Sequence, residues 1–260
     1  MKLLAAVDNS TVALPVVGTA CAIAEMFDAK VEAMHVVEGG DDFARAAADA
    51  SLVPYWRTGG DPGRELLAAV DDPDVLALAL GSRDLDDVDV DVGEVARCLI
   101  TESPRPVVVV PPVGDAPARV ERVLVALDRD LATTEALRRV LETIAATGVE
   151  IVVVHVCSPD ELPRFADQIQ HETDAWAGEF LTRYCSLPRR RIHLELRYGD
   201  VAGEVAAVAA RVAADLVVLA WRQSLDGDHG AVVRRLIGQD RVPVLLVPVA
   251  AAGQAAAVGW

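Results

Sequence analysis

Short apolar runs that end on acidic residues recur along the chain. LLAAVDNS contains Asp8 and VLVALDRD contains Asp128, and each is the pattern of a buried parallel strand with a polar residue at its carboxyl end. His35 follows Asp8 by 27 positions, and His155 follows Asp128 by the same 27. Each histidine lies inside a second apolar run. The equal spacing predicts an internal duplication.

Later segments keep the two copies aligned. A Gly-Asp turn opens an alanine-rich helical stretch at 60–61 and again at 199–200. A glycine precedes a proline by 13 positions in both copies, at 93–106 and at 230–243, and those prolines begin the closing runs PVVVVP and PVLLVP. Each half therefore reads as strand, helix, strand, variable segment, strand, helix, strand, helix, strand.

This alternation predicts an α/β fold made of two tandem, doubly wound domains, each with a five-stranded parallel sheet covered on both faces. Apolar residues at helical spacing predict helices over 12–27 and 132–147. Gly and Pro among polar residues make 113–121 the predicted boundary, so the domains are expected to span 1–112 and 121–249.

The halves differ most between their second and third strands. Histidine and glycine are 25 positions apart there in the first half and 44 in the second. We expect a long amphipathic helix over 160–185, a short alanine-rich remnant near 41–51, and a disordered tail over 250–260.

The chain is acidic, with a net charge of −16. Residues 1–112 carry 8 basic and 20 acidic side chains, whereas 113–260 carry 16 and 20. Such a surface repels nucleic acid and anionic membranes, so we expect neither as a partner. The apolar runs are far shorter than a membrane span, and the first ten residues lack a signal-peptide pattern. These features predict a cytoplasmic protein.

The four cysteines are widely separated and show no CxxC spacing. We interpret them as thiols in a reducing compartment, most of them packed in the core, rather than as metal ligands or redox groups.

The ends of the predicted strands resemble the universal stress protein family in both halves. The first half carries the resemblance in LLAAVDNS, HVV, LALALGS and RPVVVVP, and the second in VLVALD, VVVHV, DLVVLA and VPVLLVP. The resemblance implies a tandem member with the nucleotide-binding α-hydrolase-like architecture and strand order 3-2-1-4-5 in each half. It also implies pairing through the last strands, with 106–110 beside 243–247 about a pseudo-twofold axis.

ATP-binding members of that family share a loop after the fourth strand: Gly, two residues, Gly, nine residues, then Gly with Ser or Thr at a helix start. Its glycines let backbone approach phosphate, and the helix amino end offers N–H groups. In the first half Gly81 matches the first glycine and is followed by Ser82, but Asp84 replaces the second. Gly93 comes one position early, and Glu94 replaces the hydroxyl residue. A triphosphate would meet like charge here, at about 1 kcal/mol per close pair in water.

The second half departs from the same loop differently. Ala220 and Gln223 replace the first two glycines, Trp221 lies between them, and Gly230 comes three positions early, followed by Ala231, which would not block an anion. Four basic side chains could meet an anion there: Arg222, His229, Arg234 and Arg235. The last two equally suit a solvated helix face. If one half binds nucleotide, these residues favour the second.

Asp8 and Asp128 end the first strands, beside the crevice where doubly wound sheets bind ligands. The resemblance implies that such an aspartate lies near ribose and phosphates, with the backbone around Val37 or Val156 facing adenine. Alternatively, each aspartate caps the following helix. The candidate nucleotide-binding residues are Asp8, Val37, Gly81, Ser82, Gly93, Asp128, Val156, Arg222, Gly230 and Ala231.

Several other site types do not match the sequence. The acidic run DDVDVDVGE lacks the glycine of an EF-hand, and the twelfth place is Cys98, so we favour a solvated acidic loop over loose divalent-ion binding and expect no metal site. Neither Walker loop, dinucleotide fingerprint nor GxSxG elbow is present. His35 and His155 read as satisfied core histidines. We therefore expect no catalytic residues.

Two hypotheses remain for the function. The first is a stress-response regulator whose paired domains hold ATP or another adenine nucleotide as the cofactor. The second is a nucleotide-free interaction module that binds a protein partner or forms a homo-oligomer. We favour a non-catalytic regulatory or interaction module with at most degenerate nucleotide binding.

Overall fold

The computed structural model describes residues 1–37, 40–82, 92–157, 169–185, 187, 192–238 and 241–249. The first half contains β1 (Lys2–Ala6), α1 (Ala13–Met26), β2 (Lys30–Val37), α2 (Asp42–Ala50), β3 (Tyr55–Gly59), α3 (Pro62–Val70), β4 (Val75–Gly81), α4 (Glu94–Glu102) and β5 (Val107–Val110). The second half contains β6 (Arg122–Ala126), α5 (Leu131–Thr147), β7 (Glu150–Cys157), α6 (Ile169–Tyr184), β8 (Ile192–Tyr198), α7 (Val201–Val212), β9 (Leu216–Trp221), α8 (Gly227–Ile237) and β10 (Val244–Pro248).

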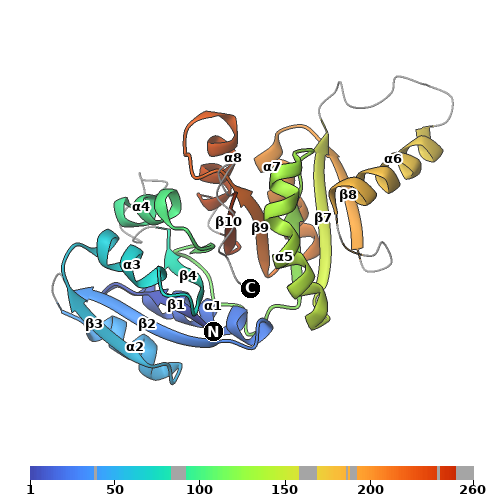
Figure 1. Ribbon diagram of the computed structural model, residues 1–260. Helices are drawn as coiled ribbons and strands as arrows, with labels where there is room; N and C mark the ends of the chain where they lie inside the picture. Colours follow the sequence, from blue (N-terminus) through green and yellow to red (C-terminus); the bar gives the residue numbers. More distant parts are fainter. Residues whose placement is uncertain are drawn as a thin grey trace.

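These strands form one ten-stranded sheet in the order β3-β2-β1-β4-β5-β10-β9-β6-β7-β8 (Figure 1). Within each half the pairing is parallel, and each half has the predicted order 3-2-1-4-5. The predicted fold class is therefore confirmed.

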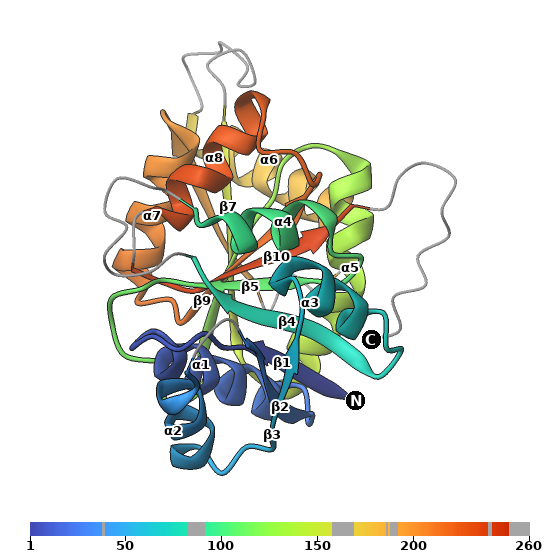
Figure 2. The ribbon, with the colours of Figure 1, turned by 90° about the vertical axis from the view of Figure 1, so that its left-hand side faces the viewer.

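The two halves join where β5 runs antiparallel to β10, with Val108 opposite Leu245 (Figure 2). The predicted adjacency of the two closing runs is confirmed. The mirrored strand order on either side of this seam is what a pseudo-twofold arrangement requires.

Helices cover both faces of the sheet. One buried cluster includes side chains from α1, α2, α5 and α6, and the other includes side chains from α3, α4, α7 and α8. In β4 the residues alternate between these clusters: Ala77 and Ala79 face the first, while Leu78 and Leu80 face the second. Full burial of each such leucine contributes about 1.5–3 kcal/mol. Because both faces of the sheet are covered, the strands read as continuous apolar runs.

The helices α1, α2 and α5 begin and end within two residues of their predicted ranges. Of the helix predicted over 160–185, the described part is α6. The segment 158–168 and the predicted tail at 250–260 lie outside the described residues. The last strand of the first half ends at Val110 and the next begins at Arg122, while the domain limits themselves stay a prediction.

Helix α6 packs on β7 through aromatic rings. His155 lies 4.5 Å from the ring of Phe180 and 5.6 Å from that of Trp176, and Tyr184 extends the row. Trp176, Phe180 and Tyr184 are three of the apolar positions whose spacing predicted this helix. Among the helices of the described ranges, none combines the length and apolar character needed to cross a membrane.

Candidate functional site

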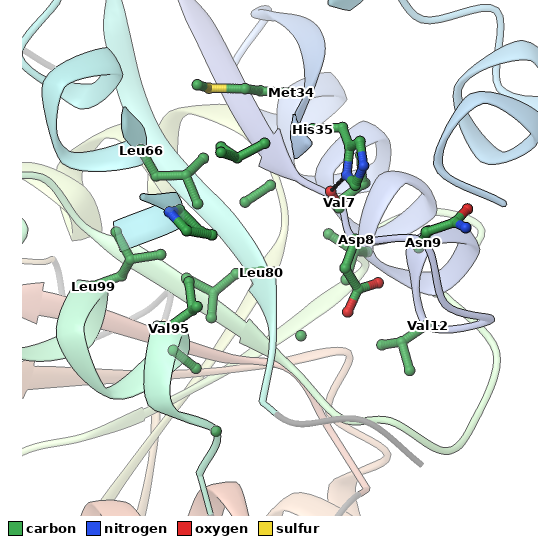
Figure 3. A pocket seen from close by; sticks show the side chains of 18 of the residues that line it. Val7, Asp8, Asn9, Val12, Met34, His35, Leu66, Leu80, Val95 and Leu99 are labelled. Carbon is green, nitrogen blue, oxygen red and sulfur yellow. Dashed lines mark hydrogen bonds between the residues drawn. The ribbon is translucent and has the colours of Figure 1, made fainter. Parts of the chain in front are cut away.

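A cavity of about 490 Å³ opens in the first half, where the carboxyl ends of β1, β2 and β4 meet the amino end of α4 (Figure 3). Its size is within the range of small-molecule sites, and its place is where doubly wound sheets bind ligands. Its walls are mainly apolar and include Met34, Leu66, Leu80 and Leu99.

Asp8 stands at the mouth of this cavity, directly after β1, and its carboxylate points toward the space between Leu80 and Val12 (Figure 3). It is exposed, and its Oδ1 accepts hydrogen bonds from the backbone N–H and the hydroxyl of Ser10, at 3.2 and 2.6 Å. The Ser10 hydroxyl oxygen in turn accepts from the N–H of Val12. Asp8 thus shapes the turn into α1 but does not itself cap the helix, whose N-cap is Val12.

Gly81, Ser82 and Gly93 also line the cavity. At Gly81 a side chain would come within 3.0 Å of the Val12 side chain, so glycine permits the close approach of α1 to β4. Gly93 is the N-cap of α4, and its N–H donates to the Ser82 carbonyl at 2.9 Å. Ser82 is fully buried, and its hydroxyl has no hydrogen-bond partner within the described part of the chain.

His35 lines the same cavity from β2. Its Nδ1 lies 2.8 Å from the carbonyl oxygen of Val7, as the dashed line in Figure 3 marks. A carbonyl oxygen only accepts, so Nδ1 carries the proton and the Nε2 of a neutral ring is an acceptor. His35 is 4% exposed, and Nε2 has no partner among the described residues. The expectation of a satisfied core histidine therefore holds for one ring nitrogen only.

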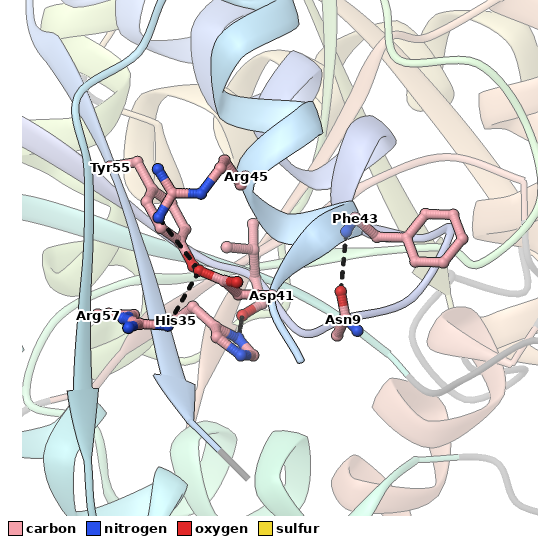
Figure 4. A network of polar contacts seen from close by, with 8 residues as sticks. Asn9, His35, Asp41, Phe43, Arg45, Tyr55 and Arg57 are labelled. Carbon is pink, nitrogen blue, oxygen red and sulfur yellow. Dashed lines mark hydrogen bonds and ion pairs between the residues drawn. The ribbon is translucent and has the colours of Figure 1, made fainter. Parts of the chain in front are cut away.

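Polar contacts hold the start of α2 beside Asn9, which lines the cavity (Figure 4). The side-chain oxygen of Asn9 accepts from the N–H of Phe43 at 2.8 Å. Asp41 Oδ2 contacts the Tyr55 hydroxyl at 3.2 Å, and forms ion pairs with Arg45 at 3.3 Å and Arg57 at 3.4 Å. Sequence reasoning did not identify Asn9 or Asp41 as site residues. Asn9 and its partner Phe43 are 34 positions apart in the sequence.

The second half fills the corresponding region with its own side chains. Asp128 Oδ1 accepts from the N–H of Asp130 at 3.0 Å and from the Thr133 hydroxyl. Asp130, not Asp128, is the N-cap of α5, accepting from Ala132. Arg222 forms an ion pair with the Asp130 carboxylate.

The structure corrects the expected position of Gly230 and Ala231 in their helix. We expected them at a helix amino end that could cradle phosphate, but α8 begins at Gly227 and contains both. A methyl group on Gly230 would overlap the backbone carbon and oxygen of Leu225 and come within 2.8 Å of its Cα. The chain preceding the helix therefore folds back over Gly230. The shorter loop, in which Asp226 takes the N-cap position, is the physical reason.

Trp221 occupies the place equivalent to Ser82. It is 1% exposed, and its Nε1–H donates to the carbonyl of Ile100, in α4 of the first half, at 2.7 Å. Its ring stacks on His229 at 6.0 Å. Burial lowers the pKa of His229. The negative charge of Asp128 raises this pKa, whereas the positive charge of Arg222 lowers it.

The remaining cations of this region also have partners. The Arg234 guanidinium donates to the Leu225 carbonyl, and Arg235 pairs with Asp200 at 2.8 Å. Within the described residues, no three His, Cys, Asp or Glu side chains gather in a way that could hold a metal ion. The acidic segment before Val92 lies outside those residues.

The model of the universal stress protein family matches residues 119–248, which is half of the chain. The chain belongs to the universal stress protein family. Its fold resembles that of solved structures over nearly its whole length. A universal stress protein from Archaeoglobus fulgidus is 16% identical with a TM-score of 0.66, over 96% of this chain and 98% of that one.

A functionally unknown protein from Pseudomonas aeruginosa is 12% identical with a TM-score of 0.64, over 95% of this chain and 92% of that one. A universal stress protein solved in complex with cAMP is 17% identical with a TM-score of 0.36, over 50% of this chain and 98% of that one. The search of curated proteins gave no significant match. At these sequence identities, the similarity to solved structures establishes only the fold of this universal stress protein.

The structure brings four of the ten predicted residues of this universal stress protein together around the cavity: Asp8, Gly81, Ser82 and Gly93. Val37 ends β2 without lining that cavity, and Val156 is part-buried in β7. The other four belong to the filled region of the second half. The expectation that the second half is the better binder stays a prediction, while the cavity described above lies in the first half.

Proposed function

We propose that this chain is a non-catalytic regulatory or interaction module of the universal stress type, and that neither half holds a nucleoside triphosphate. The observation that carries the proposal is the backbone of Leu225 lying over Gly230, at the position the family loop reserves for phosphate. We assign no catalytic residue.

Further support in the second half comes from its cations. Arg222 pairs with Asp130, Arg235 pairs with Asp200, and Arg234 donates to a backbone carbonyl. A phosphate group would have to displace these partners, and the ion pairs are already charge-assisted contacts. Its binding would therefore gain little.

In the first half, charge opposes phosphate. Asp8 and Glu94 line the cavity, and its described lining includes neither lysine nor arginine. The amino end of α4 carries a partial positive charge, but Glu94 in its first turn offsets this charge.

Binding of ATP or another adenine nucleotide is the second candidate, and the open cavity at the carboxyl ends of β1 and β4 favours it. On this candidate ATP would bind the first half. For either candidate we propose a cytoplasmic protein that contacts a protein partner or a second copy, rather than nucleic acid or membrane, since the net charge is −16.

Calorimetry with ATP, with and without magnesium, separates the two candidates. We expect neither heat of binding nor a thermal shift at millimolar ATP. Binding at micromolar ATP would contradict the proposal. Comparison of Ser82→Trp with Asp128→Ala would then identify the half responsible, because the first fills the first-half cavity and the second removes a carboxylate of the second half.

A further inference from the structure

The first-half cavity is lined by hydrogen-bond acceptors and also by donors, which are the Asn9 amide group and the N–H groups in the first turn of α4. The Nε2 of a neutral His35 carries a lone pair and lacks a partner among the described residues. The buried Ser82 hydroxyl, also without a described partner, can accept or donate. Asp8 and Glu94 contribute carboxylates, which only accept when ionised. A ligand that brings N–H or O–H donors would match these acceptors.

The charges of the cavity separate into a rim and an interior. Asp8 and Glu94 are exposed, whereas Met34, Leu66 and Leu99 are all buried. The partners described for the Asp8 carboxylate are the N–H and hydroxyl of Ser10, both neutral and both on Oδ1. Within the described residues Glu94 forms no ion pair. Among the described lining residues the two rim carboxylates thus face no lysine or arginine, while the interior is mainly apolar.

The equivalent position in the other half carries a large side chain. The pairing of β1 with β4 and of β6 with β9 makes Ser82 equivalent to Trp221. The indole of Trp221 is buried and bonded to Ile100. Ser82 is small and lines the cavity, and its hydroxyl has no hydrogen-bond partner among the described residues.

We propose that the first-half cavity binds a small organic cation, a protonated amine carried on an apolar body, with the ammonium at Asp8 and Glu94 and the body against Met34, Leu66 and Leu99. This rests on the proposed function, in which the cavity takes no triphosphate. The partial positive charge of α4 does not reverse the preference, because two full carboxylates exceed about half an elementary charge.

Three probes with one indole body and different charge test the proposal by calorimetry: tryptamine, tryptophol and indole-3-acetate. Tryptamine is expected to bind most tightly and indole-3-acetate most weakly. The difference between these two is expected to be about tenfold or more, because each contact with a carboxylate changes sign between them.

Variants assign the effect to the cavity. Asp8→Asn is expected to weaken tryptamine about fivefold and leave tryptophol unchanged, since it removes a surface charge but little volume. Asp49→Asn, an exposed change on the last turn of α2, is the matched control and is expected to alter neither. Ser82→Trp is expected to abolish binding of both, with folding checked by its thermal transition.

Absence of tryptamine binding at millimolar concentration, equal affinity for indole-3-acetate, or equal effects of Asp8→Asn and Asp49→Asn would each overturn this inference. The ATP titration keeps the two ideas separate. If neither ATP nor tryptamine binds, only the amine site is overturned. If ATP binds and tryptamine does not, both proposals are overturned.

Discussion

Ser82 and Trp221 occupy equivalent positions at the end of the fourth strand of each half, where the first is a small side chain that lines the cavity and the second is a buried indole. The next glycine in the family loop also has a different position in each half. Gly93 is an N-cap facing a cavity, whereas Gly230 is inside α8 beneath the backbone of Leu225. The two halves thus differ at the same two positions.

The close contact at Gly230 predicts a large cost for a single methyl group. Gly230→Ala should lower the free energy of unfolding by about 2 kcal/mol or more, because the obstacle is rigid backbone. Urea denaturation measures the loss. Gly59→Ala is the control, since nothing lies within 4 Å of the added carbon, and it should change stability by less than about 0.5 kcal/mol. Equal effects would show that Leu225 does not contact Gly230.

At the scale of elements, α4 links the cavity to the other half. Its amino end lines the cavity, and its last carbonyls are satisfied from the second half. Residue 104 is proline, which has no N–H for the Ile100 carbonyl, and Trp221 supplies one instead. Gln223 donates to the Ser103 carbonyl at 2.8 Å.

Trp221→Phe removes this cap and keeps an aromatic ring. We expect it to lower the free energy of unfolding by about 1–3 kcal/mol, because a buried carbonyl loses its donor. Trp56→Phe is the control: Trp56 is 39% exposed, and its replacement should be nearly neutral. Denaturation curves of the two variants give the comparison. A loss at Trp56 as large as at Trp221 would count against the capping role.

The sequence predicted the elements far better than the contacts between them. Equal spacings of strand ends are local features, so strand order and most helix limits could be predicted. Asp8, Gly81, Ser82 and Gly93 were identified because family glycines and strand ends mark them. The bond between Trp221 and Ile100 spans 121 positions, and the fold of Leu225 over Gly230 depends on where α8 begins. Neither leaves a pattern in the sequence.

For the whole molecule, the antiparallel seam of β5 and β10 joins the two halves into one sheet, and each of the two buried clusters draws on both halves. Val108 and Leu245 face each other across it and are fully buried. Contacts from Trp221 and Gln223 reinforce the same junction. The halves should therefore lose their structure together.

Calorimetric unfolding should accordingly show one transition, with calorimetric and van't Hoff enthalpies in agreement. Val108→Thr buries a hydroxyl at the seam and should lower the free energy of unfolding by about 1–2 kcal/mol while the transition stays single. Val113→Thr, at a position 57% exposed, is the matched control and should have little effect. Two resolved transitions in the unaltered protein would contradict this expectation.

The seam has one more consequence, for stoichiometry. Two identical subunits that meet in this way must carry identical sites, so a change that fills one site fills both. Here both partners of the interface lie on one polypeptide, and each half can change alone. One half has Trp221 where the other has Ser82. A ligand of the first half would therefore saturate at one molecule per chain, with no cooperativity between the halves. Dilution would not separate the two halves, because they lie on one polypeptide.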